Sequence, residues 1–166
     1  PVAVYASDVN GDGITELPRA VLMAGYKDTS SSDAVYMLDW YAYGIGKVPV
    51  KVATTYQNIS DAWSLLIDQK WHDRITAIKA NDGGLSYVEF FEYRKNKMSI
   101  PLFNIYCATG SNREYYAERT DLIQLGQTTQ AIYFAKLTNE GEQSELALTG
   151  DEIKARFSLV NQAWNN

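Results

Sequence analysis

The segment from Asp8 to Glu16 constrains this chain more than any other part of its sequence. It reads Asp-Val-Asn-Gly-Asp-Gly-Ile-Thr-Glu, so oxygen-bearing side chains recur at every second position before Glu16 closes the run. Calcium takes roughly 6–8 oxygen ligands and tolerates irregular geometry, so short alternating side chains can converge on it from one loop. The glycine after Asp12 allows a sharp bend, beyond which we expect the Ile14 carbonyl to point inward. The segment therefore predicts a calcium site.

The loop does not fit the helix-loop-helix type of calcium site. That site ends in a bidentate Glu at its twelfth position, whereas the twelfth position counted from Asp8 is the cation Arg19. Pro18 disfavours a helix interior, and the flanking apolar residues are typical of strands. We expect a strand before the loop with Val2, Val4 and Tyr5, and another from residue 19 to residue 26. A hairpin turn without metal is the alternative, because Asn-Gly and Asp-Gly are strong turn pairs.

The same residues carry a resemblance to a known family. The loop resembles the Asp-x-Asn-x-Asp-Gly-x-x-Glu loop of FG-GAP or VCBS blades in extracellular β-propellers. This resemblance implies that the calcium ligands are the side chains of Asp8, Asn10, Asp12 and Glu16 and the main chain of Ile14. No second copy of the loop occurs in the sequence, and closing a propeller needs about four to eight blades. The chain therefore holds a single blade-like meander. We expect further sequence before Pro1, and either that sequence holds the other blades or the meander packs on the domain that follows.

Apolar and aromatic residues alternate with polar ones over most of the chain and predict strands. The expected strands after the loop cover residues 34–43, 48–56, 63–67, 74–80, 85–94, 100–108, 121–124 and 130–137. Polar turns are expected at residues 27–33, 44–47, 68–71 and 81–84. The apolar residues from Trp63 to Trp71 also fit helical spacing, and a strand followed by a turn is our interpretation of that segment.

The C-terminal part differs in pattern. Residues 149–152 form a capping box, and Ile153, Phe157, Val160 and Trp164 recur at helical spacing, which predicts an amphipathic helix over one face of the sheet. A polar turn at residues 58–61 predicts a boundary between a blade-like β-meander with the calcium loop (1–57) and an α+β domain (58–166). The expected fold class is α+β, with a mainly antiparallel sheet, an N-terminal blade-like β-meander and a C-terminal α-helix.

A second resemblance covers residues 56–137. It rests on the Asn-Ile-Ser-Asp-Ala-Trp opening that ends at Trp63, on the turn at Trp71, and on the Pro-Leu-Phe-x-Ile-Tyr strand from Pro101 to Tyr106. These features are similar to domains that follow propeller blades in Firmicute surface lipoproteins, and distantly to the PsbP-type α+β fold. The resemblance brings no catalytic motif to this chain.

Composition excludes several classes of partner. The net charge is -5 and the pI is about 4.9, without a Lys/Arg cluster, so we expect no nucleic-acid partner. No apolar run approaches the roughly 20 residues of a membrane-spanning helix. The single cysteine, Cys107, lies among apolar residues and is expected to be buried and inert. We expect an extracytoplasmic protein, secreted or anchored to the cell surface, because weak calcium sites fill where free calcium is millimolar.

Candidate catalytic groups are few. His72 is the only histidine and lies next to Asp73. A Ser-His-Asp triad would need Ser60 or Ser64 as its nucleophile. The sequence contains neither a nucleophile elbow nor the paired histidines of a zinc site. A glycosidase needs a carboxylate pair, and the available residues are Glu89, Glu92, Glu114 and Glu118. All four alternate with apolar residues, so we expect them on solvated faces. The chain is predicted not to be an enzyme.

Aromatic residues make up 13% of the chain, an excess that fits either a core or a ligand platform. Tyr36, Trp40, Tyr41 and Tyr43 share one expected strand, and Trp40, Tyr41 and Tyr43 are the candidate ligand-binding residues. The leading hypothesis is a non-catalytic, calcium-stabilised extracytoplasmic module with a structural or adhesive role and an unknown protein or glycan ligand. A carbohydrate- or peptide-binding module that uses the aromatic side chains is the first alternative. A glycoside hydrolase is the second.

Overall fold

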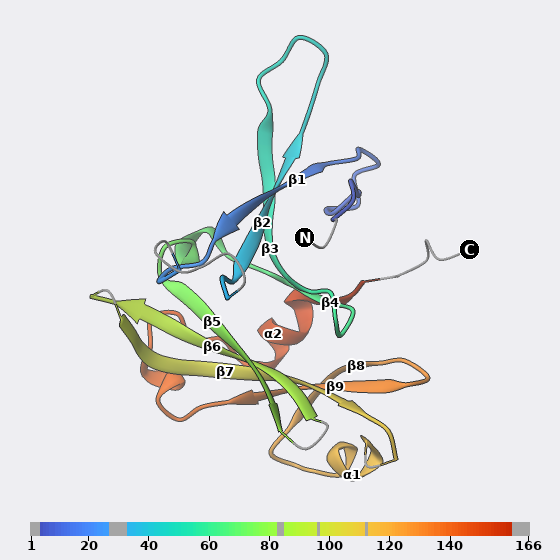
Figure 1. The fold of residues 1–166 in the computed structure, drawn as a ribbon, viewed down its shortest axis with the longest axis vertical. Helices are drawn as coiled ribbons and strands as arrows, with labels where there is room; N and C mark the ends of the chain where they lie inside the picture. The colour runs from blue at the N-terminus through green and yellow to red at the C-terminus, as the bar shows by residue number, and fades with distance from the viewer. Residues whose placement is uncertain (1–3, 27–32, 83–84, 96, 112, 161–166) are drawn as a thin grey trace.

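A computed structural model of the chain describes residues 4–26, 33–82, 85–95, 97–111 and 113–160. These residues form two five-stranded antiparallel sheets with two short α-helices and two 3₁₀ turns (Figure 1). Two predicted connections are described only in part: residues 27–32 of the polar loop expected at 27–33, and residues 83–84 of the turn expected at 81–84, lie outside the described residues.

The first sheet combines a meander from the N-terminal part of the chain with one strand from the C-terminal part. Its order is β1 (Leu17–Leu22), β2 (Tyr36–Ala42), β3 (Val50–Asn58), β4 (Trp63–Leu66) and β10 (Phe157–Leu159). The turn between β2 and β3 is closed by a hydrogen bond from Lys47 N to Gly44 O, 3.0 Å long. The predicted turn at residues 44–47 is therefore confirmed.

The second sheet holds the middle of the chain. Its order is β5 (Ile75–Asp82), β6 (Leu85–Arg94), β7 (Lys97–Thr109), β9 (Ala131–Leu137) and β8 (Ile123–Gln127). The short helix α1 (Arg113–Ala117) follows β7, and β8 lies at the edge because β9 inserts between it and β7. Every strand pair in the described residues is antiparallel, which agrees with the predicted mainly antiparallel sheet.

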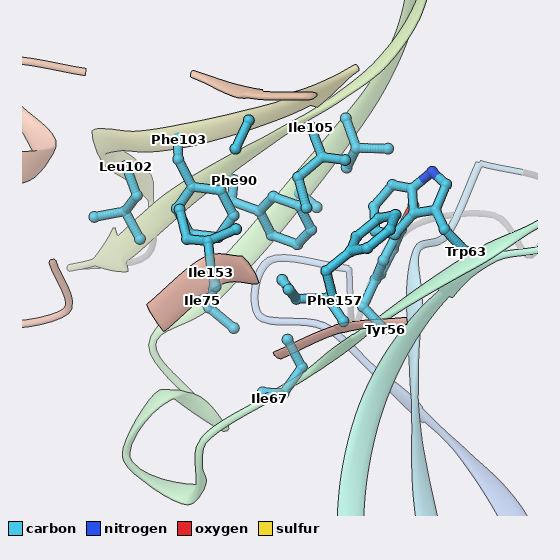
Figure 2. Packing of buried hydrophobic residues seen from close by; sticks show 14 of the residues in the cluster. Tyr56, Trp63, Ile67, Ile75, Phe90, Leu102, Phe103, Ile105, Ile153 and Phe157 are labelled. Carbon is cyan, nitrogen blue, oxygen red and sulfur yellow. The ribbon is translucent and has the colours of Figure 1, made fainter. Parts of the chain in front are cut away.

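One aromatic core joins the two sheets (Figure 2). Tyr56 of the first sheet packs edge-to-face on Phe90 of the second, with ring centroids 5.3 Å apart, and Phe90 stacks on Phe103 at 4.8 Å. Such pairs add about 0.5–1.5 kcal/mol each beyond the burial of their apolar area. Residues on both sides of position 58 therefore contribute to a shared core.

The expected α+β class is wrong, because the described chain is mainly β. The capping box is confirmed: Thr149 Oγ1 accepts from Glu152 N at 3.2 Å, and Glu152 Oε2 accepts from Thr149 N at 2.8 Å. The helix α2 that it starts covers only Gly150–Arg156. Phe157 has extended backbone (φ -82°, ψ 137°) and begins β10, which pairs with β4. Strand pairing and burial of Phe157 thus override the helical spacing, and Trp164 lies outside the described residues.

Several boundaries also differ from expectation. The strand expected before the loop is not formed at residues 4–6, and Tyr5 is 72% exposed. Among the described residues, the one bridge that joins this part of the chain to the segment beyond the loop lies between Ser7 and Glu16. Val2 lies outside the described residues. The strand expected at residues 121–124 is β8 at Ile123–Gln127. The interpretation of residues 63–71 is confirmed, since β4 is followed by a 3₁₀ turn at Gln69–Trp71.

Candidate metal centre

The loop from Asp8 to Glu16 is closed at its base by main-chain hydrogen bonds. Ser7 N donates to Glu16 O at 3.1 Å, and Glu16 N donates to Ser7 O at 2.9 Å. Between these residues, Gly11 (φ 77°) and Gly13 (φ 84°) adopt left-handed backbone that a side chain would strain. The two glycines therefore let the chain reverse direction within a few residues, as their spacing predicts.

Asp8 organises the interior of the loop. Its Oδ1 accepts hydrogen bonds from Gly11 N at 2.7 Å and Asp12 N at 3.1 Å, and its Oδ2 accepts from Gly13 N at 2.8 Å. Three main-chain donors thus converge on one carboxylate. This arrangement fixes the backbone of the loop around Asp8.

Asp12 and Asn10 face each other within the same loop. Asn10 Nδ2 donates to Asp12 Oδ2 at 2.9 Å, and Asn10 Oδ1 accepts from Asp12 N at 3.0 Å. Asp12 Oδ1 accepts from Ile14 N at 2.8 Å. The Ile14 side chain is exposed, and the role of its carbonyl as a ligand stays a prediction.

Glu16 is the member of the set that is fully buried, with 0% exposure. Its Oε2 accepts from Val9 N at 2.9 Å, whereas its Oε1 is buried without a hydrogen-bond partner in the described part of the chain. Burying a carboxylate oxygen without a partner is costly unless a counter-charge satisfies it. The carboxylates of Asp8, Asp12 and Glu16 each place an oxygen within 4.8 Å of the others. The buried Glu16 carboxylate therefore belongs to a cluster of three acidic groups.

This donor set fits a hard divalent cation. All of its side-chain ligands are carboxylate or amide oxygens, which suit calcium or magnesium and not the softer metals that prefer sulfur or imidazole. Each ionised carboxylate offers about four lone-pair positions, so the hydrogen bonds to Asp8 and Asp12 leave acceptor capacity for an ion. Of the five predicted ligands, the structure brings Asp8, Asp12 and Glu16 together and places Asn10 against Asp12.

The candidate aromatic ligand-binding residues do not form one exposed surface. Trp40 is buried at 1% exposure, and its Nε1 donates to Thr55 Oγ1 at 2.9 Å. Tyr41 is half-buried, and Tyr43, beyond the end of β2, is 55% exposed. Tyr43 is therefore the most accessible of the three aromatic rings.

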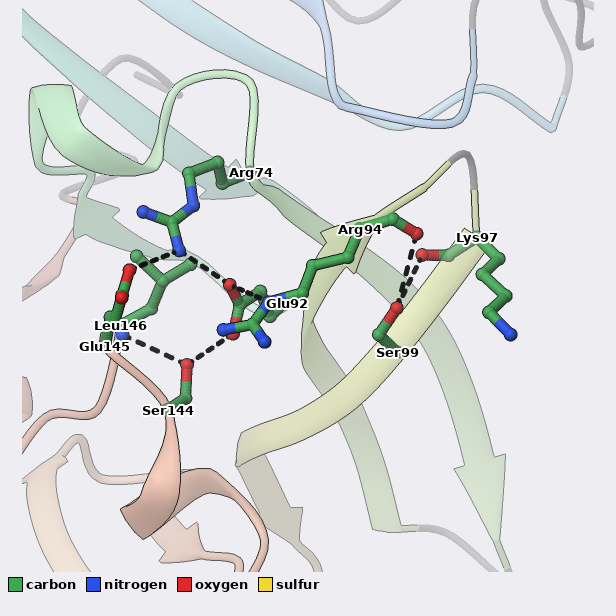
Figure 3. Close-up of polar contacts among 8 residues, drawn as sticks. All are labelled: Arg74, Glu92, Arg94, Lys97, Ser99, Ser144, Glu145 and Leu146. Carbon is green, nitrogen blue, oxygen red and sulfur yellow. Dashed lines mark hydrogen bonds and ion pairs between the residues drawn. The ribbon is translucent and has the colours of Figure 1, made fainter.

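The prediction of a solvated face is wrong for Glu92, which is fully buried. Figure 3 shows its carboxylate between two arginines and a serine: Oε1 accepts from Arg74 Nη2 at 2.8 Å and Arg94 Nε at 2.6 Å, and Oε2 accepts from Ser144 Oγ at 2.5 Å. Burial raises the pKa of Glu92, but the hydrogen bonds from Arg94, Ser144 and Arg74 outweigh it and hold the pKa below its ordinary value.

The other candidate catalytic groups are scattered. Glu114 and Glu118 are exposed, as expected, and Glu89 is half-buried on β6. His72 faces a residue that the sequence did not suggest, since its Nε2 lies 3.5 Å from Oδ1 of the buried Asp39, and its Nδ1 lies 3.8 Å from Asp73.

Comparison of this chain with family models, with curated proteins and with solved structures finds no match. Among the helices of the described residues, none has the length and apolar character needed to cross a membrane. The two family resemblances therefore stay predictions that depend on the motif residues themselves.

Proposed function

We propose that the Asp8–Glu16 loop binds one calcium ion and that the ion serves to stabilise the fold. The observation that carries the proposal is the fully buried Glu16 carboxylate, which has one oxygen without a hydrogen-bond partner in the described part of the chain and which clusters with the carboxylates of Asp8 and Asp12. A bound cation supplies the positive charge that this cluster lacks.

The position of the loop supports a structural role for the ion. Asp8 and Asp12 belong to the loop, whereas Glu16 immediately precedes β1 and is bonded to Ser7. One ion shared by these carboxylates would tie the loop to the edge of the first sheet and relieve their mutual repulsion. The glycine-rich loop would then lose conformational freedom in exchange for metal coordination.

We further propose that the protein is non-catalytic and extracytoplasmic, and that it has a structural or adhesive role and binds a protein or glycan ligand. Calcium sites of modest affinity fill where free calcium is millimolar, which supports a location outside the cytoplasm. Burial, followed by the charge of Asp61, raises the pKa of Cys107 to about 11, so this thiol is a poor nucleophile. Of the three candidate aromatic residues, Tyr43 is the most accessible to such a ligand.

Isothermal titration calorimetry with calcium and with magnesium tests the proposal. We expect one calcium site per chain and weaker magnesium binding, because magnesium demands octahedral geometry and gives up its waters reluctantly. Asp12→Asn should weaken calcium binding by about tenfold or more, whereas the exposed Asp82→Asn control should bind like the wild type. Equal binding to both Asn variants and the wild type would show that the loop is only a turn.

A further inference from the structure

The β2–β3 hairpin extends away from the rest of the first sheet (Figure 1). β3 pairs with β2 down to Val50, but it pairs with β4 only from Thr55 to Asn58. Ile67 N then donates to Thr54 O at 2.8 Å, and the chain turns into the 3₁₀ turn that follows Asp68. Residues 50–53 therefore have no neighbouring strand on the β4 side among the described residues.

A cleft of about 290 Å³ lies beside this free edge. Its walls come from β3, from the end of β4 and the residues after it, and from α2. The lining includes Lys51, Thr54, Leu66, Asp68, Gln69 and Arg156. Two exposed apolar side chains lie here: Val50 on the free edge of β3, and Leu66 in the lining of the cleft. The cleft thus combines unpaired main chain with apolar contact area.

The charges of the cleft favour an acidic occupant. The lining of the cleft holds two cations, Lys51 and Arg156, and one acidic residue, Asp68, whereas the whole chain has 20 acidic and 15 basic residues. Arg156 lies over the Trp71 ring at 5.6 Å, and its Nη2 is 3.4 Å from Asp68. Lys51 Nζ lies 3.4 Å from Asp39. Both contacts are long for hydrogen bonds, so each cation keeps donors for a further carboxylate.

We propose that the free edge of β3 at residues 50–53 binds an extended acidic peptide segment of a partner protein, which adds a strand to the first sheet. Main-chain hydrogen bonds to an exposed edge provide affinity in this mode, and alternate side chains provide specificity. Pro49 and Lys51 are residues of the kind that protect an edge from indiscriminate pairing. An acidic segment can pair with this edge because its carboxylates form ion pairs with Lys51 and Arg156.

Fluorescence anisotropy with labelled peptides tests this inference. The probes are a capped hexapeptide of alternating valine and glutamate, its counterpart with lysine in place of glutamate, and an acidic peptide with alternate main-chain nitrogens methylated. We expect the acidic peptide to bind about tenfold or more tightly than either of the others. The double variant Lys51→Gln/Arg156→Gln should lose about tenfold in affinity, and Lys79→Gln/Arg119→Gln should stay within about twofold of the wild type.

Three outcomes would overturn the proposal. The first is equal binding of the acidic and lysine peptides, or no binding of the acidic peptide at about 1 mM. The second is undiminished binding of the methylated peptide, because strand addition requires main-chain donors. The third is a dimer in sedimentation that Lys51→Gln dissolves, which would assign the edge to a second copy of this chain. If the Arg156 substitution unfolds the protein by near-ultraviolet circular dichroism, Lys51→Gln alone, compared with Lys79→Gln, decides the peptide test.

Discussion

Phe157 stacks on Trp63 with ring centroids 5.9 Å apart and an interplanar angle of 30°. Phe157 also packs against Tyr133 of β9, with ring centroids 5.6 Å apart. One side chain from the C-terminal strand β10 therefore packs against both sheets, where Figure 2 shows it beside Tyr56 and Trp63. Phe157 reaches this position in the core because α2 ends at Arg156 and β10 begins at Phe157.

Phe157→Ala should lower the free energy of unfolding by about 3–5 kcal/mol, because it leaves a cavity between the sheets. The matched control is Leu159→Ala on the same strand, where the side chain is 36% exposed and the cost should stay near about 0.5 kcal/mol. Urea denaturation followed by tryptophan fluorescence measures both. Similar losses for the two variants would show that Phe157 does not join the sheets.

Glu92→Gln tests the buried carboxylate and its two arginines. The neutral variant should lose about 1.5–3 kcal/mol at neutral pH, because the hydrogen bonds from Arg74 and Arg94 lose their charged acceptor. The two arginine side chains are 40% and 45% exposed, so water still solvates their charge. Glu145→Gln is the control, since Glu145 also binds Arg74 but its side chain is 76% exposed, and it should cost at most about 1 kcal/mol.

The pH dependence of Glu92 has a defined sign. Its folded-state pKa is lower than its unfolded pKa, so its contribution to stability is complete above the unfolded pKa and is lost as the pH falls through the folded pKa. Between about pH 5 and pH 3, the wild type should therefore lose stability more steeply than Glu92→Gln. Parallel curves of urea midpoint against pH would contradict this account of the carboxylate.

Thr149→Ala should destabilise the protein by about 1 kcal/mol, because the hydroxyl caps α2 through Glu152 N. Thr149→Ser keeps the hydroxyl and should retain most of the stability. Thermal unfolding followed by circular dichroism compares the two variants. An equal loss in both would point to the threonine methyl group and away from the cap.

Cys107 should react slowly with a thiol reagent in the folded protein. Burial raises its pKa to about 11, so at about pH 8 only about a thousandth of the thiol is ionised. The rate of reaction with Ellman's reagent should rise by about a hundredfold or more in urea, as the thiol reaches its ordinary pKa and becomes accessible. A folded-state rate close to that in urea would contradict its burial.

Local patterns predicted most of the strands but could not predict how helix α2 ends. The apolar residues at 153 and 157 fit a helix, and only the presence of β4 as a partner makes residue 157 the start of a strand. Pairing between segments far apart in sequence has no signal in a window of ten or twenty residues. The capping box, by contrast, depends on residues 149–152 alone and was predictable.

Glu92 shows the opposite kind of error, because the sequence did contain a signal for its burial. Val88, Phe90 and Glu92 alternate along β6 and all three are buried, as the period of two in a strand requires. What the sequence could not show is that Arg74 and Ser144, distant along the chain, supply the partners that make burial tolerable. The loop at Asp8 was predictable because its residues are contiguous, whereas the full burial of Glu16 was visible only in the structure.

The most direct test of calcium stabilisation is the thermal midpoint of the wild type and Glu16→Gln, measured in chelator and in millimolar calcium. In chelator, the variant should melt at or above the wild-type temperature, because it removes a buried, unpartnered charge next to Asp8 and Asp12. In calcium, the wild type should gain about 2.7 kcal/mol at a hundredfold excess over the dissociation constant, and the variant should gain little. A wild-type midpoint that calcium leaves unchanged, or an equal calcium shift in Glu16→Gln, would contradict the proposed metal site.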